Sequence, residues 1–266
     1  MSLETSAGPP RRLLRPLDTL EQRWSRLAPH AEIARPAGDG PFPVVVLFHG
    51  CGGKRAFLSR YVRTAMDAGV IAVAVDSFAP RGIGRARAIA LVCTGLELPG
   101  WQRAGDVLAA VWGVSRMAKV DPARMVLAGW SHGSWAMMDL MTMPLTRPGE
   151  AGLADPDPGL LAPIRGQFLA YPYCGPGALS QLRPWRRAAE VFAIIGEKDA
   201  VALPAFTRRA LRTAERAGSK IETWLASGAT HAFDEDGAAV SRFRYDPDLA
   251  AEAERRLAAF LRRTLF

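Results

Sequence analysis

Short apolar runs rich in β-branched residues alternate along this chain with longer stretches in which apolar residues recur at helical spacing. The runs of strand length fall at residues 43–48, 70–75, 125–128, 166–171, 190–195 and 220–226. Most of them are continuously apolar, which is typical of parallel strands buried on both faces of a sheet. The alternation therefore predicts the α/β class, with a mostly parallel central sheet and helices on both of its faces.

The helical stretches fall at 56–68, 102–117, 134–143 and 247–265. Residues 1–40 form an N-terminal extension in which 18–27 could be a helix and 31–34 a short edge strand. Residues 144–163 are rich in proline, glycine and aspartate, and they predict a loop that could shape the mouth of a cleft. No repeat and no shift in composition marks a boundary, so we interpret residues 41–266 as one domain.

The composition, 49% hydrophobic and 23% charged, is that of an ordinary soluble globular protein. No run approaches the about 18 apolar residues of a membrane span, and the N-terminus lacks the apolar run of a signal peptide. We therefore expect a cytoplasmic protein without a membrane partner. The net charge of +8 comes from scattered arginines without a nucleic-acid-binding motif, so we expect no nucleic-acid partner. The oligomeric state, monomer or homodimer, stays open.

A G-x-S-x-G sequence at residues 129–133 directly follows one predicted strand and precedes a predicted helix. This is the setting of a nucleophile elbow, a sharp turn that holds its serine in a strained conformation beyond the strand ends. The glycines at its two ends leave room for the backbone. Ser131 is therefore the candidate nucleophile, and the alternative is a turn serine that caps a helix.

A serine hydroxyl needs a base near neutral pH, and the chain has only four histidines. His30 lies in the irregular N-terminal part, His49 ends a strand, and His132 is the neighbour of the serine. His231 follows the last predicted strand in a loop that could reach over the strand ends. His231 is therefore the candidate base, and the alternative is a histidine of a surface loop.

The imidazole needs a carboxylate that fixes its tautomer, and in this class of site the acid lies between the serine and the histidine in sequence. Only Glu197 and Asp199 occupy a loop directly after a buried strand in that interval. We favour Asp199 and keep Glu197 as the second choice. Asp234 follows the histidine too closely and is interpreted as a solvated loop residue.

Acyl transfer also requires backbone donors for the oxyanion of the tetrahedral intermediate. The N–H of His132, next to the serine, is one candidate. The other is the N–H of Cys51, rather than its thiol, because the glycines of the 49–53 loop allow close backbone approach. A phosphate-binding loop is disfavoured because the G-K-[ST] ending and a complete G-x-G-x-x-G are missing.

Together these segments resemble the dienelactone hydrolase family. The resemblance covers roughly residues 40–260 and rests on His49-Gly50-x-Gly52-Gly53, Asp76-Ser-Phe-x-Pro-Arg-Gly82, Gly129-Trp-Ser-His-Gly133, Ala170-Tyr-Pro-Tyr-Cys174, Gly196-Glu-Lys-Asp199 and His231-Ala-Phe233. It implies an α/β-hydrolase fold with little or no cap domain and activity on esters or lactones. The founding members carry a cysteine nucleophile where this chain has Ser131, so the resemblance implies a serine carboxylesterase.

The resemblance also implies which side chains face a substrate, and each aromatic one could equally be core. The candidates are Phe78, Arg81, Trp130, Trp135, Tyr171 and Tyr173. Arg81 is a candidate for a substrate carboxylate, because its guanidinium is a two-pronged donor. The alternative is an arginine that pins its own loop.

The three cysteines are too few and too irregularly spaced for a disulfide scaffold or a zinc site. Cys51 and Cys93 fall near the same end of the predicted sheet, so a disulfide between them is conceivable. We do not expect it in a cytoplasmic protein.

The sequence thus predicts a serine hydrolase that cleaves small-molecule esters or lactones by a two-step acyl transfer, without a metal or organic cofactor. The alternatives are a thioesterase, a small-peptide serine hydrolase, or a non-catalytic binding protein of the same fold.

Overall fold

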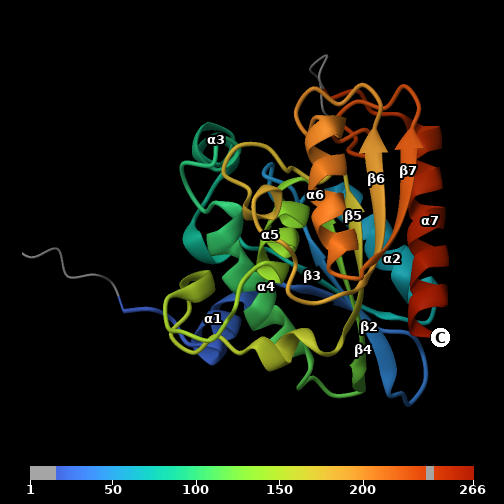
Figure 1. The fold of residues 1–266 in the computed structure, drawn as a ribbon. Helices are drawn as coiled ribbons and strands as arrows, with labels where there is room; N and C mark the ends of the chain where they lie inside the picture. The colour runs from blue at the N-terminus through green and yellow to red at the C-terminus, as the bar shows by residue number, and fades with distance from the viewer. Residues whose placement is uncertain (1–15, 238–242) are drawn as a thin grey trace, which may run out of the picture.

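A seven-stranded sheet forms the centre of the molecule in the computed structural model, which describes residues 16–237 and 243–266 (Figure 1). The strands are β1 (Glu32–Ala34), β2 (Phe42–Phe48), β3 (Ile71–Val75), β4 (Val120–Trp130), β5 (Ile164–Ala170), β6 (Glu190–Gly196) and β7 (Lys220–Ala226). They lie in the order β1-β3-β2-β4-β5-β6-β7. All neighbours are parallel except β1, which pairs antiparallel with β3.

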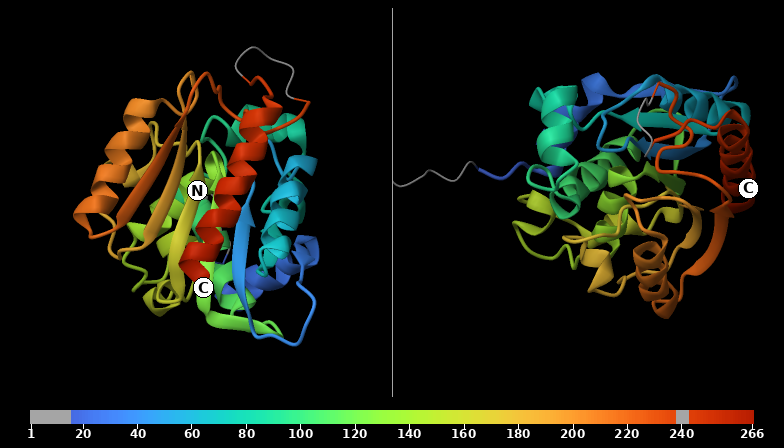
Figure 2. Two further views of the ribbon diagram at one scale, coloured as in Figure 1. Left: turned by 90° about the vertical axis from the view of Figure 1, so that its right-hand side faces the viewer. Right: turned by 90° about the horizontal axis from the view of Figure 1, so that it is seen from above.

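Helices cover both faces of this sheet. They are α1 (Leu20–Leu27), α2 (Ala56–Asp67), α3 (Arg85–Arg87), α4 (Gly100–Val114), α5 (His132–Met141), α6 (Pro204–Arg216) and α7 (Pro247–Leu265). α2 and α7 lie side by side on one face (Figure 2, left), while α1, α4, α5 and α6 pack on the other. The predicted fold class is confirmed, and no separate cap domain is present in the described residues.

Strand β2 illustrates how the continuous apolar runs build two cores. Successive side chains of a strand point to opposite faces. Val45 and Leu47 accordingly join the apolar cluster under α2 and α7, whereas Val44, Val46 and Phe48 join the cluster under α4 and α5. All five are fully buried. A run without polar positions is therefore needed to fill both sides of a parallel sheet.

Several segments differ from the prediction, among them helix α6 and the loop at 144–163. Helix α6 was not predicted, because its buried positions are mostly small or polar (Thr207, Ala210, Leu211 and Ala214) and basic residues separate them. The loop at 144–163 packs against α1 and α4 rather than around a cleft. Leu153 forms a β-bridge with Asp18, and the carbonyl of Ala151 lies against Gly105.

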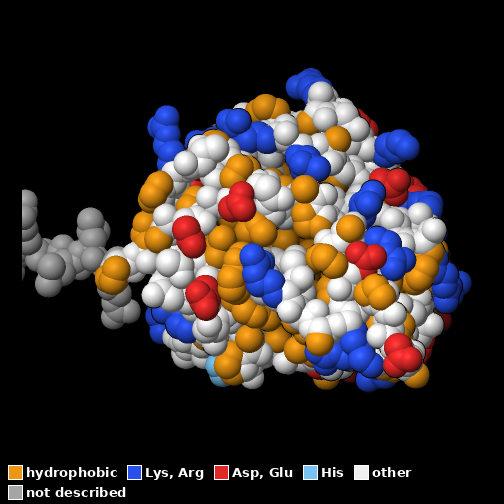
Figure 3. Space-filling view, turned by 90° about the horizontal axis from the view of Figure 1, so that it is seen from below, with side chains coloured by type: hydrophobic (Ala, Val, Ile, Leu, Met, Phe, Trp, Pro, Cys, Tyr) orange, Lys and Arg blue, Asp and Glu red, His pale blue; other side chains and the backbone are white. Residues whose placement is uncertain are grey.

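The basic residues are spread over the surface. On the face seen from below, Lys and Arg side chains alternate with acidic and apolar ones, and they form no continuous stripe (Figure 3). Among residues 16–237 and 243–266, no helix combines the length and apolar character that crossing a bilayer requires.

Candidate active site

Ser131 lies at a tight turn between β4 and α5, at the carboxyl end of the parallel strands. Its backbone has φ 49° and ψ −108°, a strained conformation for a residue with a side chain. The two flanking glycines are required sterically. A Cβ on Gly129 would lie 2.6 Å from Met137 Sδ, and a Cβ on Gly133 would overlap the carbonyl oxygen of Phe48. Glycine at these two positions therefore permits the close packing of the turn that places Ser131 at the wall of a cavity.

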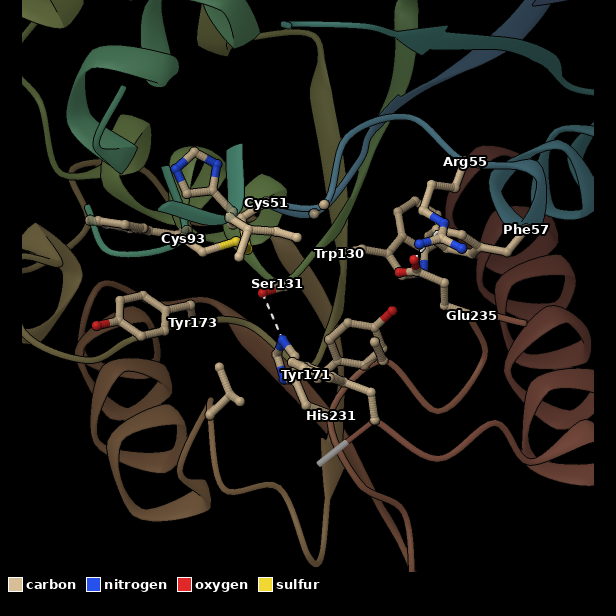
Figure 4. Close-up of a pocket in the computed structure, with 18 of the residues that line it drawn as sticks. Cys51, Arg55, Phe57, Cys93, Trp130, Ser131, Tyr171, Tyr173, His231 and Glu235 are labelled. Carbon is tan, nitrogen blue, oxygen red and sulfur yellow. Dashed lines mark hydrogen bonds and ion pairs between the residues drawn. A yellow bond between two sulfur atoms is a disulfide. The ribbon is translucent and has the colours of Figure 1, made fainter. Parts of the chain in front are cut away.

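Ser131, His231 and Asp199 are joined by two hydrogen bonds at this turn, of which Figure 4 shows the one between Ser131 and His231. Ser131 Oγ lies 2.8 Å from His231 Nε2, and His231 Nδ1 lies 2.8 Å from Asp199 Oδ2. The second carboxylate oxygen of Asp199 accepts the backbone N–H groups of Val201 and Ala202, both at 2.8 Å. Asp199 is thus held by its own loop. The side chains of Ser131, His231 and Asp199 are all buried.

The alternative candidates for the acid and the base lie elsewhere. Glu197 is exposed and accepts hydrogen bonds from Ser227 Oγ and the Gly228 N–H. His49 is fully buried and braces the loop after β2: its ring contacts the Gly50 carbonyl at 2.7 Å and accepts the N–H of Ser77. Neither side chain contacts His231.

The two expected oxyanion donors both border the cavity next to Ser131. His132 is the first residue of α5, so its N–H has no acceptor within the helix. The N–H of Cys51 has no backbone acceptor among the described residues. The loop that carries Cys51 is tightened by a hydrogen bond from the Gly53 N–H to the Gly50 carbonyl. Two unpaired backbone donors therefore lie beside the serine.

Cys51 and Cys93 form a disulfide, which corrects the expectation that these cysteines are unpaired. The bond joins the loop after β2 to the short helical segment that follows α3, and both cysteines line the cavity. The expectation failed because it rested on the inferred compartment and not on the distance between the two segments that carry the cysteines. Cys174 is free and buried.

A cavity of about 340 Å³ opens at Ser131 (Figure 4). Its lining is mainly aromatic and aliphatic, and consists of Gly50, Cys51, Gly52, Arg55, Phe57, Arg85, Ile89, Cys93, Trp130, Ser131, His132, Trp135, Tyr171, Tyr173, Val201, His231, Ala232, Glu235 and Phe243. On one side of Ser131 lie the disulfide and Tyr173, and on the other lie Phe57 and the ion pair Arg55–Glu235. The site is an apolar pocket with one polar end.

Of the predicted substrate-facing residues, Trp130, Trp135, Tyr171 and Tyr173 line this cavity. Trp135 is largely buried, its ring lies 5.0 Å from that of Tyr173, and its indole N–H donates to Asp139 at 2.8 Å.

The predictions for Phe78 and Arg81 are wrong in position. Phe78 is buried with its ring edge 4.6 Å from His49, outside the lining of the cavity. Arg81 binds both oxygens of Asp106, at 2.8 and 2.9 Å, and also donates to the Ser77 carbonyl. Both follow β3 in sequence, and Arg81 pins its own loop through the Ser77 carbonyl.

Asp234 was interpreted as solvated, and this is also wrong. It is completely buried, and its carboxylate accepts hydrogen bonds from Tyr61 Oη at 2.5 Å, Tyr171 Oη at 2.6 Å and Trp130 Nε1 at 3.1 Å. Burial raises the pKa of Asp234 above its usual range, against the three donors that lower it. The ring of Tyr171 in turn packs edge-on against His231, with centroids 4.9 Å apart. The cluster therefore ties the His231 loop to the ends of β4 and β5.

Sequence reasoning also missed the ion pair Arg55–Glu235, in which Arg55 Nε lies 2.7 Å from Glu235 Oε1. The pair joins the start of α2 to the loop after His231, two segments whose proximity has no local sequence signal. In the described residues, no three His, Cys, Asp or Glu side chains gather in a way that could hold a metal ion.

No protein-family model matches the chain. No curated protein matches it either. Solved structures, however, share its fold. A dienelactone hydrolase-like promiscuous phosphotriesterase from metagenomic libraries is 14% identical, with a TM-score of 0.63 over 89% of this chain and 92% of its own. Esterase 2 of Thermogutta terrifontis, phosphonylated by cyclosarin, is 17% identical with a TM-score of 0.61 over 87% of each chain.

A thermostable carboxylesterase from a metagenomic library is 17% identical, with a TM-score of 0.59 over 89% of this chain and 84% of its own. The chain has the α/β-hydrolase fold. The resemblance to dienelactone hydrolases drawn from the sequence is confirmed at the level of this fold. This fold places the carboxyl ends of β2, β4, β6 and β7 around Ser131, where the segments with the predicted chemistry meet.

Proposed function

We propose that this chain is a serine hydrolase that cleaves carboxylic esters or lactones through an acyl-enzyme. The observation that carries the proposal is the hydrogen-bonded chain from Ser131 through His231 to Asp199 at the wall of an apolar cavity. The similarity in fold to esterases supports it.

In the first step, Ser131 Oγ attacks the ester carbonyl carbon while its proton passes to His231 Nε2, 2.8 Å away. The Nδ1–H of His231 donates to Asp199, whose charge stabilises the imidazolium that forms. The carbonyl oxygen becomes an oxyanion, which the N–H groups of Cys51 and His132 bind. The alcohol leaves with the proton from His231, and the acyl group remains on Ser131.

In the second step, His231 takes a proton from a water molecule, whose oxygen attacks the acyl carbon. Collapse of the second tetrahedral intermediate returns the proton to Ser131 Oγ and releases the acid. The cavity of about 340 Å³ fits a small substrate, and its aromatic lining favours an apolar acyl or alcohol group. Ser131, His231 and Asp199 thus complete the cycle by acid–base and nucleophilic chemistry.

The first experiment is labelling with a fluorophosphonate probe, mapped by mass spectrometry. In wild type we expect stoichiometric modification of Ser131, because phosphonylation needs an activated hydroxyl. His231→Ala and Asp199→Asn should slow labelling by about 100-fold or more. The matched controls are His30→Ala and Glu197→Gln, which remove the same groups outside the hydrogen-bonded chain and should label like wild type.

Absence of labelling in the folded wild-type protein would contradict the proposal and favour a non-catalytic binding protein. Labelling that needs Glu197 and not Asp199 would show that the wrong acid is assigned. With labelling established, hydrolysis rates for matched p-nitrophenyl esters, thioesters and peptide anilides separate an esterase from a thioesterase or peptidase.

The cytoplasmic location stays a prediction. The disulfide between Cys51 and Cys93 counts against it, because thiols are kept reduced in the cytosol.

A further inference from the structure

Arg103, on α4, is a fully buried arginine next to the candidate active site. One of its terminal nitrogens, Nη1, lies 2.8 Å from the His49 carbonyl oxygen and 2.7 Å from His132 Nδ1. Its Nε donates to Ser77 Oγ at 3.1 Å. The guanidinium thus touches the residue that follows the nucleophile and the start of the loop that carries Cys51.

Arg103 forms no direct ion pair among the described residues, although the charges of Asp106 and Asp76 raise its pKa against the effect of burial. Asp106, one turn further along α4, is already bound by Arg23 at 2.8 Å and by both terminal nitrogens of Arg81. The second terminal nitrogen of Arg103, Nη2, is buried without an acceptor in the described part of the chain. Burying a cation in this way is costly and calls for a compensating role.

His132 does not neutralise that charge. Its Nδ1 accepts from Arg103, so its Nε2 carries the proton and donates to the Leu98 carbonyl at 3.0 Å. Burial, and then the charge of Arg103, lower the pKa of His132 well below its usual range, so the ring is neutral. Burial also lowers the pKa of Arg103 to about 10, and the guanidinium remains charged at neutral pH.

We propose that Arg103 is a positioning residue for the oxyanion hole: it fixes His132 and the 49–51 backbone from behind and holds a positive potential where the oxyanion develops. The inference rests on the proposed function. A buried charge in contact with a segment that donates to a developing oxyanion is expected to change a rate by on the order of 10- to 100-fold.

The test compares ground-state binding with oxyanion binding in Arg103→Met and Arg103→Gln. With p-nitrophenyl butyrate we expect kcat to fall about 10- to 100-fold and KM to change less than about 3-fold. The second probe is an alkyl trifluoromethyl ketone. Ser131 Oγ adds to its carbonyl carbon, the proton passes to His231, and the carbonyl oxygen becomes an anion that mimics the intermediate. Its Ki should rise by the same factor as kcat falls.

Arg23→Met is the matched control. Arg23 is another buried arginine of the same charge cluster, but it contacts Asp18 and Asp106 and neither segment of the oxyanion hole. This variant removes a buried charge and should leave kcat and Ki within about 3-fold of wild type. Thermal unfolding of each variant reports how much stability it has lost.

The lysine of Arg103→Lys keeps the positive charge but can contact fewer of the acceptors. This variant replaces Arg103→Met and Arg103→Gln in the test if those two do not fold. We expect kcat and Ki to change together by about 3- to 10-fold, with Arg23→Lys unchanged. Folded Arg103 variants with wild-type kcat and Ki would overturn the inference, and so would losses equal to those of the Arg23 variants. Inactivity of the wild type toward the ester and the ketone would instead refute the proposed function.

Discussion

Replacing Asp234 with alanine is expected to be among the most destabilising changes outside the apolar core. The carboxylate is completely buried and accepts three hydrogen bonds, from Tyr61, Tyr171 and Trp130, at 2.5, 2.6 and 3.1 Å. Removing it leaves two hydroxyls and an indole N–H buried without their acceptor. Each such donor costs about 1–3 kcal/mol, and the relief of no longer burying a carboxylate offsets part of the sum. We expect a loss of about 3–5 kcal/mol in the free energy of unfolding.

Asp234→Asn should cost less, about 1–2 kcal/mol. The amide oxygen can still accept from Tyr61 and Trp130. The hydroxyl of Tyr171 can rotate to accept from the amide nitrogen, because a hydroxyl both donates and accepts. The difference between the two variants therefore measures the value of keeping the donors paired.

The assay is equilibrium urea denaturation followed by tryptophan fluorescence and far-UV circular dichroism, fitted with a common m-value. Asp236→Ala is the control, because the Asp236 side chain lies in the same loop, is 56% exposed and makes, among the described residues, only a long ion pair with Arg60. It should change the free energy of unfolding by less than about 0.5 kcal/mol. A loss below about 1 kcal/mol for Asp234→Ala would refute the reasoning that this network is tightly coupled.

The difference in the free energy of unfolding between wild type and Asp234→Asn is expected to change with pH in a definite direction. Burial raises the pKa of Asp234 in the folded protein above its value of about 3.9 in the unfolded chain. The folded state therefore binds more protons between the two pKa values, and the free energy of unfolding falls as pH rises through that window. The stability advantage of wild type over Asp234→Asn should shrink from pH 4 upward. An advantage that grows would contradict the raised pKa.

Three further outcomes are expected. Gly133→Ala should abolish labelling of Ser131, because its methyl group would overlap the carbonyl at the end of β2; Gly84→Ala, with open space around it, should label normally. Burial raises the pKa of Asp139 to about 7, so wild type should lose stability relative to Asp139→Asn as pH rises from 5 to 7. The loss, measured by urea denaturation, should be at most about 1.4 kcal/mol per pH unit. The denatured protein should titrate one thiol without reductant and three with it, because Cys51 and Cys93 are bonded; three thiols in both cases would exclude the disulfide.

Much of the fold was predictable because parallel strands buried on both faces have to be apolar throughout. The run at 43–48 shows this directly. Helix α7, which spans the predicted range 247–265, was predictable for a different reason, the recurrence of apolar residues at helical spacing. Helix α6 escaped because charge dominates its sequence and only a narrow stripe of small side chains is buried. Periodicity is a weak signal where the buried residues are small.

The strand-to-helix turn at Ser131 was also readable, because a G-x-S-x-G sequence between a strand and a helix marks it, although the packing of Gly133 against Phe48 of β2 appears only in the fold. Arg103 could have been suspected: it lies on the stripe of α4 that carries Asp106 and Val107, and a charge among buried positions needs a partner. Asp234 offered no such signal. Its partners come from α2, β4 and the end of β5, so only the assembled fold shows that the carboxylate is buried and paired.

The sequence by itself determined the α/β class, the strained serine turn and a short set of candidates for base and acid, since each follows from the pattern of residue types along the chain. The tertiary structure decided that Asp199 and not Glu197 lies against His231, that Arg81 binds Asp106, and that Cys51 meets Cys93. Each of these depends on which strand ends and loops become neighbours. That is decided by how two cores pack against one sheet, a property of the whole chain that no local pattern records.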